Sequence, residues 1–305
     1  MPKNISSSIM RNKTGLLRYS LKSIPNYLKY FLKEHKEVLL ASGDIEPVHR
    51  MRVASRRLRA ALNAFKSILP KQKAKLWKKE ISKIGQALGR ARELDVHIRF
   101  LRAAKKKLKN DYYIVNTDLI IKSLVRKREQ AQKQVEKVLV GFEIEKNLPG
   151  LKVCLRELSS ETHRHLINKF YNLNSMAIQE QLNKLFEFVP YITNPRNIHE
   201  LHQMRIAAKN LRYTLEIIKP WYGAKIDKYI RISRNIQDAL GDLHELDVLI
   251  ELLSGLKTQD KEFNRTLEYL LHVCGRLRNN AYSKFIRIWN DLQKRRMWVK
   301  LKWEI

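Results

Sequence analysis

Four basic side chains share one face of a helix predicted over residues 47–69. At about 100° per residue, a stripe only about 80° wide holds His49, Arg52, Arg56 and Arg59. Arginine offers a planar fork of donors that suits phosphate oxygens, and histidine adds a further donor. A solvated helix face usually alternates in sign to gain i,i+4 pairs, whereas this stripe has one sign. We therefore interpret it as an anion-binding face rather than solvated surface.

The same stripe recurs about 150 residues later, which is half of the 305-residue chain. Residues 48–62 align with residues 201–215, and the second stripe consists of His202, Arg205, Lys209 and Arg212. A further pair of blocks, 84–96 and 236–248, shares the pattern Leu-Gly-x-x-x-Glu-Leu-Asp-Val. Apolar residues occupy the opposite side of each stripe helix, so that side is predicted to pack into a core. The pattern indicates one unit that has been duplicated.

Other residues of the repeat could have chemical roles of their own. His199 and His202 are spaced i,i+3 and could bind a metal, but no cysteine supports such a site and the surrounding positive charge opposes it, so no metal is predicted. The i,i+2 carboxylates of each half point about 200° apart on a helix and cannot form a catalytic dyad by themselves. We expect these carboxylates, Glu93 and Asp95 with Glu245 and Asp247, to orient the stripe arginines.

The two glycines of the shared pattern, Gly89 and Gly241, are predicted to allow a close helix approach or a bend.

Eight helices are needed to position these stripes, four in each half of the chain. They are predicted over residues 24–42, 47–69, 71–107, 114–140, 175–189, 195–219, 223–255 and 258–292. Residues 142–172, with a Leu-Pro-Gly break, are predicted to form the linker. Pro195 is expected in a first helical turn and Pro220 just after a helix end. The predicted fold is all-α, with a first repeat and linker over 1–165 and a second repeat over 166–305.

Composition agrees with a helical protein that has an anionic partner. The chain carries 61 Lys and Arg against 30 Asp and Glu, a net charge of +31, yet 44% of its residues are hydrophobic, which excludes a disordered polycation. There is no apolar run long enough for a membrane span and no secretory signal, and the two cysteines favour a cytoplasmic location. The basic tail 293–305, with Trp298 and Trp303, could contact a partner or pack on the body.

The duplicated motifs resemble the CHAD domain, the conserved histidine α-helical domain. The resemblance rests on His-x-x-Arg-(Val/Ile)-x-x-(Arg/Lys)-x-Leu-Arg at 49–59 and 202–212 and on the shared pattern at 88–96 and 240–248. It implies two pseudo-two-fold-related four-helix bundles around a basic central cavity that binds inorganic polyphosphate. The triphosphate-tunnel domain that often precedes this family has no room here, so the resemblance implies a stand-alone binding module.

The resemblance also implies which residues face the ligand. The principal positions are the two stripes, and the weaker ones are Lys79, Arg231, Lys122, Arg126 and Arg276. Arg56 corresponds to Lys209 and Lys122 to His272, so the two half-sites are expected to differ.

Three functions compete at this point. The first is non-catalytic binding of inorganic polyphosphate, with no cofactor, in the cytoplasm and in association with polyphosphate granules. The second is binding of nucleic acid, which the charge would serve equally, although few aromatic residues interleave with the stripe for base stacking. The third is a metal-dependent enzyme acting on polyphosphate, for which no nucleophile–base pair or carboxylate cluster is found. The oligomeric state is not indicated by the sequence.

Overall fold

The computed structural model describes residues 25–40, 45–66, 68–160 and 166–304, and over these residues the chain is helical and contains no strand. The all-α prediction is therefore confirmed. A helix over residues 25–40 comes first. It is followed by α2 (Ile45–Ala64), α3 (Lys71–Lys105), α4 (Asp111–Val140), α5 (Ile144–Asn147), α6 (Leu151–Ser160), α7 (Leu166–Phe186), η1 (Val189–Tyr191), α8 (Ile198–Tyr222), η2 (Gly223–Ile226), α9 (Asp227–Ser254), α10 (Lys261–Lys294) and α11 (Met297–Glu304).

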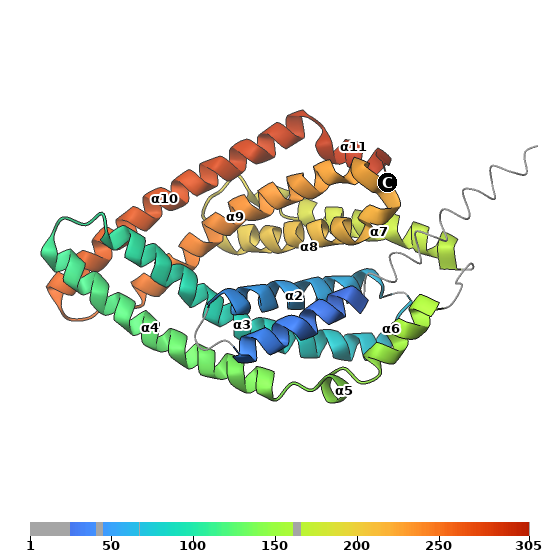
Figure 1. Cartoon of the computed structure of the whole chain (residues 1–305). Helices are drawn as coiled ribbons and strands as arrows, with labels where there is room; N and C mark the ends of the chain where they lie inside the picture. Colours follow the sequence, from blue (N-terminus) through green and yellow to red (C-terminus); the bar gives the residue numbers. More distant parts are fainter. Residues whose placement is uncertain (1–24, 41–44, 67, 161–165, 305) are drawn as a thin grey trace, which may run out of the picture.

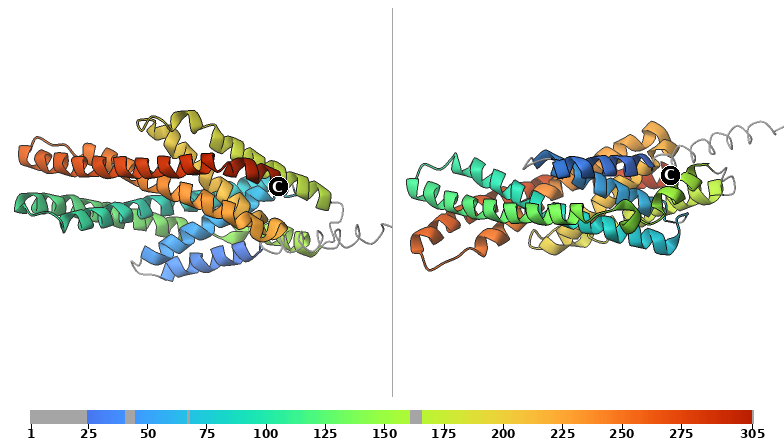
Figure 2. Two further views of the ribbon diagram at one scale, coloured as in Figure 1. Left: turned by 90° about the horizontal axis from the view of Figure 1, so that it is seen from above. Right: turned by 60° about the horizontal axis from the view of Figure 1, so that its bottom comes forward.

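The helices form two groups that meet along α2 and α8 (Figure 1). Helices α2, α3 and α4 pack on one another in sequence, as do α7, α8, α9 and α10. The hairpins α3–α4 and α9–α10 extend toward the same end of the molecule, on the left of both Figure 1 and the left view of Figure 2. Contacts of α4 with α10 and of α3 with α9 hold the two hairpins together.

The second helix of each hairpin begins at a capping side chain. Asn110 accepts hydrogen bonds from the backbone N–H groups of Tyr112 and Tyr113, at 2.9 and 3.3 Å. Asp260 accepts from the N–H groups of the second and third residues of α10, at 2.9 and 3.1 Å. Short polar side chains at this position satisfy donors that a helix start leaves unpaired. Both long helices therefore start at residues suited to it.

Two hydrophobic clusters form the core of the described residues. The first includes Met51 and Leu58 of α2, and the second includes Met204 and Leu211 of α8, so the predicted core sides of both stripe helices are buried. The first cluster also takes in the facing ends of α9 and α10, from Leu249 to Cys274. The hairpin tip of the second half thus packs against the first half, and the division into repeats at 165/166 stays a prediction.

The region between the halves differs from the predicted linker. Helices α5 and α6 flank the Leu-Pro-Gly break, and α7 begins at Leu166, nine residues before the predicted start at 175. Leu148 and Leu151 are fully buried, and Trp77 Nε1 donates to the Pro149 carbonyl at 3.1 Å. Apolar anchors on both sides of the break therefore hold this segment against α3.

The predicted positions of Pro195 and Pro220 relative to the ends of α8 were also wrong. Pro195 precedes α8, which begins at Ile198, and Pro220 lies within α8, which continues to Tyr222. Pro220 leaves one carbonyl of the preceding turn without its helical N–H donor, and the helix still continues for two residues. The predicted helix end at residue 219 was therefore too early.

The C-terminal tail packs on the body, which decides between the two alternatives for residues 293–305. Trp298 of α11 is 2% exposed, and its ring lies 6.1 Å from those of both Phe186 and Trp289. The side chain of Trp303 lies outside the described residues. No helix in the described part of the chain is long and apolar enough to cross a membrane.

Candidate functional site

The two predicted stripes come together where α2 contacts α8. The positive charge of Arg205 acts on Arg52, and the charges of Arg52, Arg56 and Arg59 act on Lys209. Apolar packing on the far side of each helix leaves the basic sides turned toward each other. The fold therefore brings together the basic residues of the two stripes that the sequence indicated.

A pocket of about 460 Å³ opens at this meeting point. Arg52 and Arg205 enter it from the two stripe helices, and the remaining walls come from α3 and α9. Its other ionisable lining residues are Arg90, Arg92, Glu93, His97, His244 and Glu245. The lining is thus mainly cationic, with one carboxylate from each of α3 and α9.

Burial and mutual repulsion alter the stripe cations. Burial, together with the charges of the nearby arginines, lowers the pKa of Lys209 to about 7 and that of Arg52 to about 10. The pKa values of Arg56, Arg59 and Arg205 are lowered mainly by burial. Each of these lowered pKa values means that the site disfavours positive charge when no anion is bound. An anion in the pocket would relieve this cost.

Several stripe guanidinium groups keep unused donors. The Nε atoms of Arg56, Arg59 and Arg205 are buried and have no hydrogen-bond partner among the described residues, whereas that of Arg212 lies 3.8 Å from the Glu216 carboxylate. Buried donors are normally paired, because an unpaired one costs roughly 1–3 kcal/mol. These donors suit an anion that has several oxygen acceptors.

Aromatic and hydroxyl groups position the rest of the stripes. The guanidinium carbons of Arg56 and Arg212 lie 5.5 and 4.6 Å from the centre of the Tyr213 ring, so one ring orients a cation from each half. Arg59 donates to the Ser82 hydroxyl of α3 at 3.2 Å. A Cβ at Gly85 would approach the Arg59 guanidinium to 3.2 Å, so this glycine leaves room for it.

The predicted histidines occupy different surroundings. His202 Nδ1 lies 2.9 Å from His244 Nδ1, with ring centres 4.1 Å apart. Burial first, and then the Arg205 charge, lowers the pKa values of both rings, that of His244 to about 3. His49 has no such partner ring, and its pKa is lowered mainly by burial and next by Arg92. No group of three or more metal-ligating side chains gathers among the described residues, and His199 lies exposed.

The carboxylates of the shared pattern have two different roles. Asp95 pairs with Arg128 of α4 at 2.7 Å, and Asp247 pairs with Arg278 of α10. The aspartates therefore tie each hairpin together rather than orient stripe arginines, and for them the expectation was wrong. Glu93 and Glu245 act electrostatically on Arg205, which agrees with it. The opposed directions of i,i+2 side chains explain the split.

Gly89 and Gly241 do not serve close packing between helices. A Cβ at either position would meet no atom within 4 Å. Gly89 instead lines the 460 Å³ pocket, where a missing side chain keeps space open. The predicted close approach was therefore wrong.

The weaker candidates lie apart from the stripes. All five are exposed and none lines the 460 Å³ pocket: Lys79 on α3, Lys122 and Arg126 on α4, Arg231 on α9 and Arg276 on α10. They remain positions on the outer surface of the helices.

Sequence reasoning missed the lining residues Arg92, His97 and His244, and also Tyr213, which contacts stripe arginines without lining the pocket. Arg92 and His244 occupy equivalent positions of the repeat, directly before Glu93 and Glu245, and both line the pocket. That shared basic position was a usable signal. Tyr213 and His97 have no counterpart of their own type in the other half, at Ala60 and Leu249, so the repeat could not reveal them.

Comparison with known proteins bears on this architecture. The CHAD domain family model matches residues 26–254. The crystal structure of the CHAD domain from the plant Ricinus communis is 20% identical, with a TM-score of 0.67 and 91% of each chain covered. PptA from Streptomyces chartreusis is 16% identical, with a TM-score of 0.65, covering 92% of this chain and 99% of that chain. No curated protein matches the sequence.

At these identities the solved structures show a shared fold. The family model spans most of the chain, including both stripe helices. The chain belongs to the CHAD domain family.

Proposed function

We propose that this protein binds inorganic polyphosphate without catalysis, in the basic pocket between α2 and α8. The observation that carries the proposal is the convergence of six stripe cations, three of which have a buried Nε donor with neither a hydrogen-bond nor an ion-pair partner among the described residues. Repeated phosphate units can use such donors in succession, each through charge-assisted hydrogen bonds. Each stripe covers 11 residues, a rise of about 15 Å, which suits an extended anion better than a single phosphate.

The proposal includes the internal duplication, with a pseudo-two-fold relation between two four-helix bundles around the pocket. Matched contacts support it. The hairpin ion pairs Asp95–Arg128 and Asp247–Arg278 occupy corresponding places, and so do the caps Asn110 and Asp260. Such a relation would present similar donors to a chain of identical units from both sides.

A binding role without chemistry suits the groups that face the pocket. Arginine stays protonated at any working pH and cannot act as a general base. The two carboxylates of the lining, Glu93 and Glu245, both act on Arg205 and so serve to balance a cation. We place the protein in the cytoplasm, at polyphosphate granules, and both of its cysteines, Cys154 and Cys274, are free thiols, as a reducing setting favours.

The test is a competition titration with paired variants. Arg52→Ala with Arg205→Ala should weaken binding of long-chain polyphosphate about 100-fold, because two charge-assisted contacts are lost. The control is Arg57→Ala with Arg196→Ala, which removes the same charge from exposed positions beside the same helices. Helical circular dichroism should be unchanged in both.

Two outcomes would contradict the proposal. One is an equal loss of polyphosphate affinity in the two variants. It would mean that binding depends on the net charge of the protein and not on Arg52 and Arg205. The other is equally tight binding of single-stranded RNA or duplex DNA at physiological salt, which would favour the nucleic-acid function. Release of phosphate from polyphosphate with added Mg²⁺ or Mn²⁺ would show an enzyme instead.

A further inference from the structure

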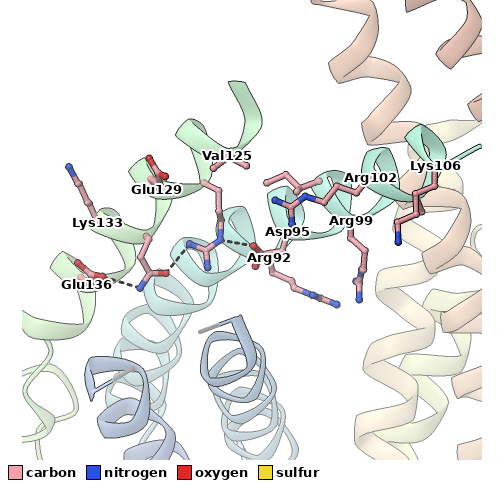
Figure 3. Close-up of a pocket in the computed structure, with 13 residues that line it drawn as sticks. Arg92, Asp95, Arg99, Arg102, Lys106, Val125, Glu129, Lys133 and Glu136 are labelled. Atoms are coloured by element: carbon pink, nitrogen blue, oxygen red, sulfur yellow. Dashed lines mark hydrogen bonds and ion pairs between the residues drawn. The ribbon is translucent and has the colours of Figure 1, made fainter. Parts of the chain in front are cut away.

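Helix α3 carries a basic stripe of its own beyond the central pocket. At 100° per residue, one face about 80° wide holds Arg92, Arg99, Arg102 and Lys106. The stripe covers 15 residues, and its first and last members are about 21 Å apart along the helix axis at 1.5 Å per residue. Figure 3 shows Arg92, Arg99 and Lys106 pointing to the same side of the helix. This distal stripe runs outward along the α3–α4 hairpin.

The distal stripe borders a groove of about 760 Å³ between α3 and α4 (Figure 3). All four of its cations line the groove, and Arg92 also lines the 460 Å³ central pocket. One side chain, that of Arg92, therefore borders both spaces. A chain of phosphates that fills the central pocket meets Arg92 at the start of the groove.

The cations of the distal stripe are not neutralised within the protein. Among the described residues, no carboxylate forms an ion pair with any of the four, although other surface cations such as Lys105 and Lys284 do have such partners. Among the described residues that line the groove, one ion pair forms, between Asp95 and Arg128. The charges of Arg92 and Arg99 also act on Glu245 of α9, so both reach toward the central pocket.

The second half lacks an equivalent stripe. The aligned positions on α9 and just beyond it are His244, Glu251, Ser254 and Thr258. The basic extension is thus confined to one side of the pocket.

We propose that the distal stripe of α3 is a second binding segment for polyphosphate, which holds the part of a long chain that leaves the central pocket on the side of the α3–α4 hairpin. This inference rests on the proposed function. It predicts a preference for long chains and a single direction of exit. On the α4 wall Arg128 and Lys133 offset Glu129 and Glu136, whereas the α3 wall keeps a net positive charge, so the anion would lie against α3.

The test compares tripolyphosphate with long-chain polyphosphate. Tripolyphosphate is too short to extend from the central pocket to Lys106. The variant Arg99→Ala, Arg102→Ala, Lys106→Ala should lose about tenfold in affinity for the long chain and keep its affinity for tripolyphosphate. Its slope of log K against log salt for the long chain should fall in magnitude by about 2, since roughly 0.7 is lost per phosphate contact.

The control variant is Lys71→Ala, Lys73→Ala, Lys75→Ala. It removes the same charge from exposed positions at the other end of α3, and alanine favours the helix in both cases. Equal effects of the two triple variants on long-chain binding would overturn the inference. Failure of the wild-type protein to bind either ligand would instead overturn the proposed function, so the two failures are distinguishable.

A gain-of-function variant gives a second check. Glu251→Arg with Ser254→Arg places cations at the matching exposed positions of α9. Tighter binding of the long chain with unchanged binding of tripolyphosphate is expected. An unchanged affinity for the long chain would contradict the view that exposed cations at these hairpin positions contribute to binding.

Discussion

Lys209 is the stripe residue whose charge depends most on the ligand. It corresponds to Arg56 in the first half, so one half-site has a cation that can lose its proton and the other does not. Burial and four neighbouring arginines lower its pKa to about 7. A bound polyanion would raise this pKa again, because an opposite charge favours the protonated form. Binding should therefore take up a proton.

Proton uptake predicts that affinity falls as pH rises. Between pH 7 and 9 the affinity for polyphosphate should drop by up to tenfold per pH unit, because Lys209 must be protonated before it pairs. Lys209→Arg should flatten this profile while keeping the positive charge. Calorimetry in two buffers of different ionisation enthalpy measures the proton count directly. Identical pH profiles for the wild type and the arginine variant would refute the assignment.

The same shift has an opposite effect on the empty protein. The folded-state pKa of Lys209 lies below its unfolded value of about 10.5, so the unfolded state binds more protons between pH 7 and 10.5. The contribution of Lys209 to the free energy of unfolding therefore rises with pH in that window. Stability and affinity thus depend on pH in opposite directions at this one residue.

At the scale of elements, each hairpin is held by a largely buried ion pair. The aspartate of each pair belongs to the shared sequence pattern, but the pattern did not reveal its partner. Asp247 pairs with Arg278, which also donates to the Pro195 carbonyl at 2.7 Å. One arginine thus connects α9, α10 and the turn before α8. Burial raises the pKa of Asp247 despite this partner, so the pair as a whole is costly to bury.

Removing one partner of this pair should be more damaging than the pair is stabilising. Asp247→Ala leaves Arg278 buried without its carboxylate and should lower the free energy of unfolding by about 3 kcal/mol. Asp242→Ala, which breaks an exposed pair with Lys284, should cost less than about 1 kcal/mol. Urea denaturation compares the two, and similar costs would contradict the structural role of the pair.

The sequence predicted elements and faces well because both follow from periodicity. All eight stripe positions lie on α2 and α8 as expected, with Met51 and Met204 buried behind them. The misses have a different origin. Asp95 finds Arg128 on the next helix, and Tyr213 lies between arginines of both halves, so these contacts depend on tertiary structure. Periodicity within one helix contains no information on such partners.

At the scale of the whole molecule, the net charge of +31 opposes the compact empty state. The greatest concentration of unneutralised cations lies between α2 and α8, where burial strengthens their repulsion. A site built to hold a polyanion should therefore reduce the stability of the protein that lacks one. Functional sites commonly have this cost.

This cost predicts that the central double variant is more stable than the wild type when empty and less stable when ligand is present. Arg52→Ala with Arg205→Ala removes two mutually repelling charges, so its melting temperature should rise in the absence of polyanion. Polyphosphate at 100 times Kd should add about 2.7 kcal/mol to the wild type, and much less to the variant at the same concentration. The order of the two melting temperatures should thus reverse on adding polyphosphate.

Thermal unfolding with and without long-chain polyphosphate, at two concentrations of NaCl, measures this reversal. Salt screens the repulsion, so it should raise the melting temperature of the empty wild type more than that of the variant, and it should weaken the stabilisation by polyphosphate. Arg57→Ala with Arg196→Ala controls for net charge, because these exposed positions are already screened by water. If that control gained as much stability as the central variant, the repulsion would belong to the charge of the whole molecule, and the two stripes would not be its source.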